Sequence, residues 1–262
     1  FEQGRELADE VIANYYREHG RYPDKLAFSL WSIETLRHSG VLESQALYAM
    51  GVKPVWSDDG RVVGTEIIPA AELKRPRVDV VLSATGLYRD AFPNVMQRLA
   101  KAIEQVAQLK EDNNSLWDNS QRIAQQLQQQ GVEAQEAQYL STVRIFSNAS
   151  GEYGSGVNDA VVASDTWEQD SKIADLYMSK MGYFYGSDNS RWGKKVGLVT
   201  GPDGREQEVN LYAQQLSGTD VALFSRSSNV SGMLSSDDPF EYFGSLALAV
   251  RNLDGKSPAM MI

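Results

Sequence analysis

The chain has 262 residues, of which 42% are hydrophobic and 23% are charged, a composition typical of one large globular domain or two small ones. Its net charge of −10 argues against nucleic acid or an anionic membrane surface as a partner, because their phosphate groups would repel it. The absence of cysteine excludes disulfides, thiolate metal sites and cysteine nucleophiles, and it fits a cytoplasmic protein. No signal peptide or membrane-spanning stretch is visible.

The first fifty residues predict a helix, a buried strand and a second helix. Helical periodicity and a continuous apolar run place these elements at 1–20, Leu26–Trp31 and Val41–Met50. A charged loop, residues 32–40, joins the strand to the second helix and holds Glu34, Arg37 and His38. Strand, loop and helix form the first half of a βαβ unit, and ligands bind beyond the carboxyl ends of such strands in open α/β sheets.

The chain up to residue 138 continues this pattern. We expect a strand at Val52–Trp56 parallel to the first, and a hairpin turn at 57–60 that joins it to a strand at 62–68. A buried strand at 77–82, a polar loop at 83–90 and a helix at 91–110 should follow. Residues 111–138 are rich in Asn and Gln but carry an apolar stripe of Leu116, Ile123 and Leu127. This stripe favours a helical hairpin over a disordered linker.

The second half starts a new series of elements. We expect a strand at 143–146, a loop at 147–156, helices at 157–163 and 171–181, and an irregular segment at 182–197. A helix at 206–216, a strand at 220–224 and a loop at 225–238 should follow, and then a helix at 239–252 and a strand at 259–262. The prediction is an α/β fold of mostly parallel sheets with flanking helices, in Rossmann-like or flavodoxin-like lobes. Residues 1–140 form a first lobe that ends in the Gln-rich hairpin, and residues 141–262 form a second.

The polar loops follow four of the predicted strands. They are residues 32–40, 83–90, 147–156 and 225–238. If the strands are parallel, all four loops lie along one edge of the sheet, which is the edge where ligands bind. The chain begins at Phe1 without a methionine and ends on an apolar run, so we also expect a piece of a longer polypeptide.

Several motifs for nucleotide or metal binding come close and fail. Gly154 and Gly156 would need a third glycine at the position of Asp159, and Lys195 stands where a Walker A loop needs Ser or Thr. We therefore expect no nucleotide hydrolysis by this chain. The only histidines are His19 and His38, which excludes a cage of several histidines around a metal.

Glu34, His38 and Glu43 form the first candidate constellation. A carboxylate close to an imidazole can orient and charge it, or the two groups can share a cation. The alternative is a surface loop in which Glu43 complements the helix dipole and Ser39 caps the helix.

Arg89, Asp90 and the residues around Glu152 provide further candidates. Asp90 fits a helix cap, whereas Arg89 could pair with a carboxylate of a ligand. The segment Glu152–Gly156, with Tyr153 and Ser155, has glycines that either let the backbone turn or let a flat ligand approach closely.

A capping box is predicted near the C-terminus, with Asp238 as N-cap and Glu241 at N3. The residues together indicate an α/β ligand-binding piece with carboxylates, an imidazole and arginines at one edge. A sugar- or nucleotide-binding α/β module without catalysis remains the alternative from another class.

The same loops resemble a known family over nearly the whole chain from Tyr22 onward. The matching blocks, in order, are LAFSLWSIETLRHSGVLESQALYAMGVKPVW, GRVVGTEIIPAAELKRPRVDVVLSATGLYRDAFPN, RIFSNASGEYGSGVNDAV and SSDDPFEYFGSLALAVRNLDGK. They resemble the large subunit of cobaltochelatase and, less closely, the porphyrin-binding large subunit of magnesium chelatase. Members of that family are far longer, which agrees with a piece of a longer chain.

The resemblance implies a subunit that binds a tetrapyrrole and inserts a metal ion, while separate AAA+ partner subunits hydrolyse ATP. The cobalt branch inserts cobalt(II) into hydrogenobyrinic acid a,c-diamide on the route to cobalamin; a magnesium and porphyrin function stays open. An isolated piece, without the rest of the parent chain, is expected to be inactive.

The resemblance also implies roles for individual residues. Because two pyrrole protons must leave, a general base is needed, and Glu34, His38 and Glu152 are the candidates. Ligand carboxylates would meet Arg37, Arg89 and Arg226, with Tyr153 and Ser155 as further substrate-binding residues. His38 and Glu43 are the expected metal ligands. Cobalt(II) accepts imidazole nitrogen readily, whereas magnesium prefers oxygen; alternatively His38 only bonds a neighbouring loop.

Overall fold

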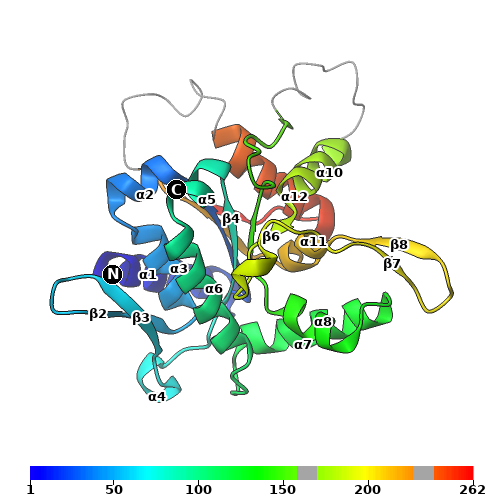
Figure 1. Ribbon diagram of the computed structural model, residues 1–262. Coiled ribbons are helices and arrows are strands. Elements are labelled where there is room, and N and C mark those ends of the chain that lie inside the picture. Colours follow the sequence, from blue (N-terminus) through cyan, green and yellow to red (C-terminus); the bar gives the residue numbers. More distant parts are fainter. Residues whose placement is uncertain (158–169, 227–238, 262) are drawn as a thin grey trace.

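A six-stranded sheet forms the centre of the computed structural model, which describes residues 1–157, 170–226 and 239–261 (Figure 1). In sheet order the strands are β10 (Ala259–Met261), β9 (Val221–Phe224), β1 (Lys25–Leu30), β4 (Asp79–Ala84), β5 (Ile145–Ser147) and β6 (Tyr183–Phe184). All neighbouring pairs are parallel except β5 and β6, which are antiparallel. The predicted α/β class with a mostly parallel sheet and flanking helices is confirmed.

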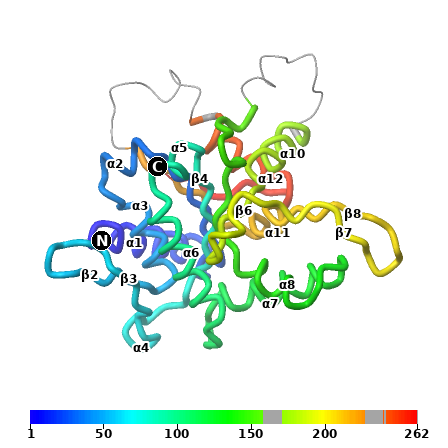
Figure 2. Tube along the Cα trace, in the orientation of Figure 1, coloured from blue at the N-terminus to red at the C-terminus, as the bar shows by residue number. Residues whose placement is uncertain are grey.

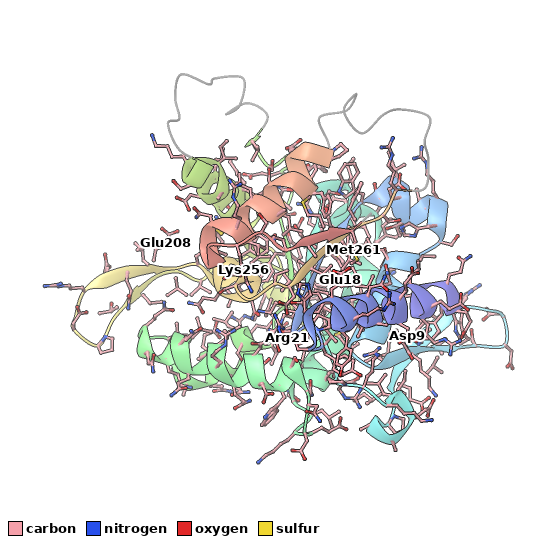
Figure 3. All side chains as sticks on the ribbon, turned by 180° about the vertical axis from the view of Figure 1, so that it is seen from behind. Asp9, Glu18, Arg21, Glu208, Lys256 and Met261 are labelled. Carbon is pink, nitrogen blue, oxygen red and sulfur yellow. The ribbon has the colours of Figure 1, made fainter. Side chains whose placement is uncertain are left out.

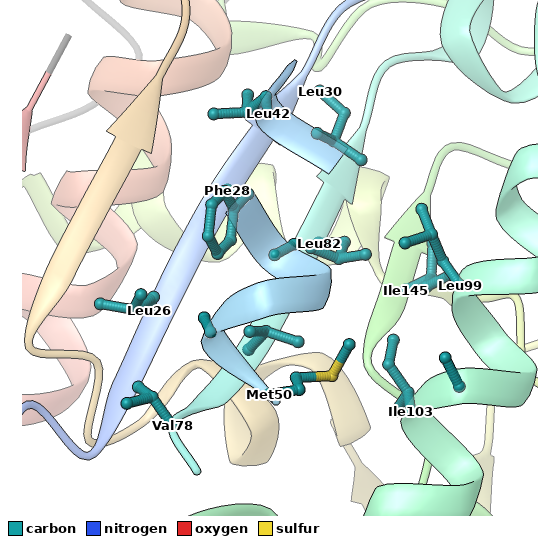
Figure 4. Close-up of a cluster of buried hydrophobic side chains, with 14 of the residues drawn as sticks. Leu26, Phe28, Leu30, Leu42, Met50, Val78, Leu82, Leu99, Ile103 and Ile145 are labelled. Atoms are coloured by element: carbon teal, nitrogen blue, oxygen red, sulfur yellow. The ribbon is translucent and has the colours of Figure 1, made fainter. Parts of the chain in front are cut away.

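The central strands β1 and β4 are mostly apolar and fully buried because helices cover both of their faces. All six residues of β1 are buried, and successive side chains point to opposite sides. Leu26, Phe28 and Leu30 belong to one core cluster, and Ala27 belongs to the other. Figure 4 shows the first of these clusters, in which Leu26, Phe28 and Leu30 of β1 lie beside side chains of the neighbouring strands and under a helix.

Three long helices cover the first face of the sheet. They are α1 (Glu2–His19), α3 (Val41–Ala49) and α6 (Pro93–Ala107). Gly4 of α1 lets this helix pack closely on α3, since a Cβ atom at that position would lie 2.5 Å from the Cβ of Ser44. Figure 3, seen from behind, shows α1 with Asp9 and Glu18 labelled, close to the edge strand that carries Met261.

Five helices cover the second face. They are α7 (Ser115–Gln129), α8 (Ala134–Ser141), α10 (Asp170–Met181), α11 (Leu211–Leu216) and α12 (Ser245–Asp254). The Gln-rich segment is the helical hairpin α7–α8, and Ile123 and Leu127 of its apolar stripe pack against Val81 and Phe146 of the sheet. A π-helix, Pro239–Gly244, precedes α12 where a regular helix was expected.

Both halves of the chain contribute to the same sheet. β1 lies between β4 of the N-terminal half and β9 of the C-terminal half, so the expected boundary near residue 140 does not divide the sheet. From β1 the chain adds β4 and β5 on one side, and then β9 and β10 on the other. The direction of winding therefore reverses between β1 and β9, which is the topological switch point of a Rossmann-type sheet.

Two hairpins extend outside the central sheet on opposite sides of the molecule (Figure 2). The first pairs β2 (Val52–Trp56) with β3 (Val62–Ile67) in antiparallel fashion, and the second pairs β7 (Gly197–Thr200) with β8 (Glu206–Val209). The prediction that residues 52–56 run parallel to the first strand is wrong. The tight turn with Gly60 at φ 77° pairs them with β3 instead.

Other segments predicted as loops or as a single helix have a different structure. Residues 32–40 are mostly helix α2 (Ser32–His38), and residues 83–90 contain the end of β4 and helix α5 (Gly86–Ala91). Residues 206–216 divide into β8 and α11, because Asn210 caps α11 by accepting from the N–H of Ala213.

The remaining short elements are α4 (Ala70–Leu73) and a 3₁₀ turn at Asn189–Arg191. Most of the helix expected at 157–163, most of the loop expected at 225–238 and the last residue of the expected strand at 259–262 lie outside the described residues. Across the described ranges, no helix is long and apolar enough to cross a membrane.

Candidate functional site

The predicted polar segments follow the carboxyl ends of adjacent parallel strands. α2 follows β1, α5 follows β4, residues 148–156 follow β5, and Ser225 and Arg226 follow β9. α2 and α5 are in contact at this edge, and Figure 1 shows them at the same end of the sheet. The predicted convergence on one edge holds for the described parts of all four segments.

Glu34 and Arg37 form one unit on α2. The guanidinium of Arg37 donates to Oε1 of Glu34 at 2.9 Å, one helical turn away. Glu34 is 7% exposed, whereas the side chain of Arg37 is 50% exposed. Arg37 can therefore still contact an anionic group from solvent, while Glu34 is largely enclosed.

His38 ends α2 and caps the next helix. Its Nδ1 accepts a hydrogen bond from the backbone N–H of Val41 at 3.0 Å. A neutral imidazole that accepts at Nδ1 carries its proton on Nε2, and this Nε2 is buried without a hydrogen-bond partner among the described residues. A metal ion bound at Nε2 would move that proton to Nδ1. Nδ1 could then no longer accept from the N–H of Val41, and this hydrogen bond would be lost. The metal role of His38 therefore remains a prediction.

Glu43 is enclosed in the first turn of α3. It is 5% exposed, and its Oε1 accepts from the hydroxyl of Thr35 at 2.7 Å. Gly40, at φ 81°, is the N-cap residue of α3, so the alternative role of Ser39 as cap is wrong. The metal role predicted for Glu43 also remains a prediction, since the described residues contain no group of three or more His, Asp or Glu side chains suited to a metal.

Arg89 anchors the segment after β5. Its guanidinium is buried and donates to the backbone oxygens of Asn148 at 3.1 Å, Ala149 at 2.6 Å and Glu152 at 3.2 Å. It also forms a paired contact with Asp90, with Nε 2.7 Å from Oδ1. These bonds occupy most of the guanidinium donors and hold the segment after β5 in place, so the role of Arg89 in binding a ligand carboxylate remains a prediction.

Asp90 is not the helix cap that the sequence predicted. Thr85 caps α5 instead, and α6 begins without a side-chain cap. Asp90 accepts from Arg89 and from the hydroxyl of Tyr153 at 2.6 Å, and these hydrogen bonds, that from Arg89 first, hold the pKa of Asp90 below its usual value. Tyr153 is 58% exposed and lies beside Arg89, whose guanidinium carbon is 5.5 Å from the ring centre.

Glu152 and Ser155 have different surroundings although they are three residues apart. Glu152 is exposed, whereas Ser155 is fully buried and donates through both its backbone N–H and its hydroxyl to the carboxylate of Glu241. The sequence predicts a capping box that joins Glu241 to Asp238, which lies outside the described residues. No sequence signal links Glu241 to Ser155, because the two residues are far apart in the chain.

Buried polar atoms without partners gather at this edge. Nine side-chain atoms of the described residues are buried and lack a hydrogen bond, and five of them lie at or after the carboxyl ends of β1, β4 and β5. The five are His38 Nε2, Glu43 Oε2, Tyr88 Oη, Ser147 Oγ and Asn148 Oδ1. Buried polar groups are normally bonded, so this edge is where water or a ligand is needed.

The structure joins the candidates into two adjacent groups. Glu34, Arg37 and His38 share α2, and direct contacts link Arg89 to the segment that holds Glu152 and Tyr153. Arg226 follows β9 at the same edge and lines a cavity of about 390 Å³ between β9 and the helices α1 and α3. The prediction of one shared cleft for all of these residues remains a prediction.

The chain belongs to the CobN/Magnesium Chelatase family, whose sequence profile matches residues 1–262. It is 32% identical over 99% of its length to the aerobic cobaltochelatase subunit CobN of a Sinorhizobium species. It is 31% identical over 93% of its length to a magnesium-chelatase subunit of Cereibacter sphaeroides. In each case it spans 19% of the relative.

The same family is seen among solved structures. The chain superposes on the catalytic subunit of cobaltochelatase from Mycobacterium tuberculosis with a TM-score of 0.85 and 31% identity. The match covers 99% of this chain and 20% of that subunit. The chain therefore spans about one fifth of the length of the relatives it matches.

Proposed function

We propose that this chain is a piece of the large subunit of an ATP-dependent chelatase that inserts cobalt(II) into a corrinoid. The observation that carries the proposal is the match to a cobaltochelatase catalytic subunit over 99% of the chain. Partner subunits of the AAA+ class would hydrolyse ATP, as the resemblance to the chelatase family implies, and the absence of a Walker A loop in this sequence is consistent with that role. The isolated piece would bind substrate weakly and would not insert metal by itself.

The exposed apolar side chains at the carboxyl edge favour the proposal that the substrate is flat and apolar. Ile33 and Leu36 on α2, Leu87 on α5 and Tyr153 are 55%, 69%, 61% and 58% exposed. Exposed large apolar side chains that gather near polar groups are typical of a binding surface. One face of a tetrapyrrole macrocycle would cover them and leave its carboxylate arms near Arg37, with Arg226 as a second contact.

The removal of the pyrrole protons requires a base, and the candidate carboxylates differ in how well they could serve as one. Insertion of a divalent metal releases two protons from pyrrole nitrogens, and a base near the macrocycle must accept them. Glu152 is the exposed carboxylate among the candidates, so we propose it as the base that faces the substrate. Glu34, enclosed and bonded to Arg37, would orient that arginine, and Ser155 would hold the segment in place through Glu241.

His38 would favour cobalt over magnesium, because cobalt(II) accepts imidazole nitrogen and magnesium prefers oxygen ligands. Calorimetry with cobalt(II) and zinc(II), on the wild type and His38→Ala, should show lower affinity on substitution. For the wild type, affinity should also fall between neutral pH and pH 5, since the metal must displace a proton. Unchanged binding in both comparisons would remove His38 from the site.

Magnesium insertion into a porphyrin is the second candidate, favoured by the 31% identity to the magnesium-chelatase relative. The deciding assay uses the full-length parent protein with its ATPase partners and ATP. It compares cobalt(II) and hydrogenobyrinic acid a,c-diamide with magnesium and protoporphyrin. Cobalt insertion supports the first proposal and magnesium insertion the second, whereas no insertion of either metal contradicts both. Turnover by the isolated piece would show that the predicted dependence on the parent chain is wrong.

A further inference from the structure

A second cavity, of about 380 Å³, lies between α2, α3, α6 and the β2–β3 hairpin. Most of its lining is apolar: Leu36, Leu47, Trp56, Val62, Phe92, Val95 and Leu99 contribute to it. Two charged residues also line it, Glu43 of α3 and Arg98 of α6. Cavities of this size, apolar with a few polar groups, are typical of small-molecule sites.

Glu43 gives the cavity an enclosed hydrogen-bond acceptor. Thr35 satisfies Oε1, but Oε2 has no hydrogen-bond partner in the part of the chain that the structure describes. The buried Tyr88 hydroxyl lies close to this carboxylate, but no hydrogen bond of normal length joins the two groups. Burial, followed by the negative charge of Glu43 and a weak hydrogen bond to it, raises the pKa of Tyr88 well above its usual value. A buried carboxylate oxygen is costly to leave without a donor, and an N–H group of a ligand would supply one.

Arg98 gives the same cavity a cation. Its side chain is half-buried, and within the described ranges it forms neither an ion pair nor a hydrogen bond. A guanidinium has five donors and binds a carboxylate through two parallel hydrogen bonds. The cavity therefore has a carboxylate, Glu43, that can bind a positive group, a guanidinium, Arg98, that can bind a negative group, and an apolar wall.

A bare metal ion does not fit this arrangement. Glu43 belongs to no group of three acidic or imidazole side chains among the described residues, and Arg98 would repel a cation from the same cavity. The volume and the apolar lining also exceed what an ion would use. The structure thus favours an organic ligand for Glu43 over the metal role that the sequence indicated.

We propose that this cavity binds a small zwitterion with an apolar body, its ammonium group held by Glu43 and its carboxylate held by Arg98. The larger hydrophobic amino acids belong to this class. Thr35 and Leu36 belong to α2, which also carries Glu34 and His38. A bound ligand would therefore fix the position of the helix that borders the candidate chelatase site.

Calorimetry on this chain tests the proposal with three probes of one shape. L-phenylalanine carries both charges, phenethylamine only the positive one and 3-phenylpropionate only the negative one. L-phenylalanine should bind at least about tenfold more tightly than either of the others, since each charged contact is worth about this factor. Equal affinity for all three probes, or no binding of L-phenylalanine, would overturn the proposal.

Two variants locate the contacts. Glu43→Gln keeps the shape and the bond from Thr35, and it should weaken phenethylamine and L-phenylalanine about tenfold while leaving 3-phenylpropionate unchanged. Arg98→Gln should weaken 3-phenylpropionate and L-phenylalanine and leave phenethylamine unchanged. Glu66→Gln and Arg61→Gln remove exposed charges of the β2–β3 hairpin that do not line the cavity, so they are the matched controls.

Melting curves of all four variants establish that they are folded. Cobalt(II) binding that is lost in Glu43→Gln and unchanged in Arg98→Gln would return Glu43 to the metal role and contradict the zwitterion site. The result is independent of the chelatase assay, because it requires neither the parent protein nor ATP.

Discussion

The two edges of the central sheet differ in how their buried charged groups are paired, although the side-chain oxygen of Gln215 at the amino edge also lacks a partner among the described residues. At the amino edge, Lys25 and Asp79 begin neighbouring strands and are fully buried, as is Arg144 just before β5. Arg144 donates to Asp79 at 2.8 Å, and Lys25 donates to two backbone oxygens, of Gln215 at 2.8 Å and of Ser217 at 2.7 Å. At the carboxyl edge, buried atoms of His38, Glu43, Tyr88, Ser147 and Asn148 have no partner among the described residues.

The difference separates scaffold from site. In a buried ionic network whose members bond one another, no donor or acceptor remains to bind a ligand, but the network holds the strand ends in a fixed arrangement. Buried polar atoms without partners indicate the opposite, since a folded chain normally pairs them. We therefore expect substitutions at the amino edge to change stability, and substitutions at the carboxyl edge to change binding.

The largest effect on stability is expected for Asp79→Ala. It would leave Arg144 and Lys25 as buried cations without their carboxylate, which costs about 3–5 kcal/mol of the free energy of unfolding. Urea unfolding measures this cost. Asp203→Ala, which removes an exposed ion pair with Arg205, is the control and should cost less than about 1 kcal/mol. Equal losses in the two variants would contradict the assignment of the amino edge as scaffold.

Arg89→Lys should have the next largest effect, about 2 kcal/mol. A lysine keeps the charge but cannot reach the three backbone oxygens and Asp90 together, and hydrogen bonds to charged groups contribute about 1.5–3 kcal/mol. Hydrogen exchange should become faster in residues 148–155, the segment that Arg89 holds. Arg17→Lys on exposed α1 is the control. Unchanged exchange would show that Arg89 does not position this segment.

A smaller effect depends on pH and on Lys25. Burial lowers the pKa of Lys25 to about 8, whereas a lysine in the unfolded chain titrates near 10.4. Between these values the unfolded chain holds a proton that the folded chain has lost. The free energy of unfolding should therefore rise with pH, by at most about 1.4 kcal/mol per pH unit.

Urea unfolding of the wild type and of Lys25→Met between pH 7 and 9 measures this contribution as the difference between their two slopes. The comparison is needed because tyrosines of the unfolded chain titrate near 10, below the raised pKa of the buried tyrosines, which lowers the free energy of unfolding with rising pH in both proteins. Well below pH 8 both states hold the Lys25 proton, so the difference should vanish. Equal slopes above pH 8 in the two proteins would assign the pH dependence to other groups.

The smallest effect on stability is expected for Glu152→Gln at the carboxyl edge. Glu152 is exposed, and Arg89 contacts its backbone oxygen and not its carboxylate, so the free energy of unfolding should change by less than about 0.5 kcal/mol. In the full-length parent protein the same substitution should slow metal insertion about 100-fold or more, as expected for loss of a general base. A normal insertion rate would remove Glu152 from the chemistry.

The sheet could be predicted from the sequence because its central strands are buried on both faces. Runs such as Leu26–Leu30 and Val78–Leu82 are apolar except for Ser29 and Asp79, and their positions were right to within about two residues. Residues 52–56 were also recognised as a strand that a hairpin turn joins to residues 62–68, and this hairpin is confirmed. The further expectation that they run parallel to the first strand was wrong, because the strand pairs outside the central sheet, where the crossover argument does not apply.

The edge that holds the candidate site was also predictable, whereas the contacts within it were not. Polar segments after parallel strands place Glu34, His38 and Arg89 at one edge on topology alone. That Arg89 bonds backbone oxygens, or that Glu241 bonds Ser155, depends on loop paths that residue spacing does not encode. The ion pair between Asp79 and Arg144 was missed for the same reason, since Asp79 begins β4 and Arg144 lies just before β5, far along the chain.

The position of β1 in the sheet has a consequence for how the chain folds during synthesis. Its partner on one side, β4, follows within the first third of the chain, but Leu26 pairs with Val221 on the other side. Contacts between residues so distant in sequence form slowly, because a long loop must close first. Until β9 has left the ribosome, one side of the most buried strand stays open to pairing with other chains. Production of this protein should therefore depend on chaperones, and more so at higher temperature, where intermediates aggregate faster.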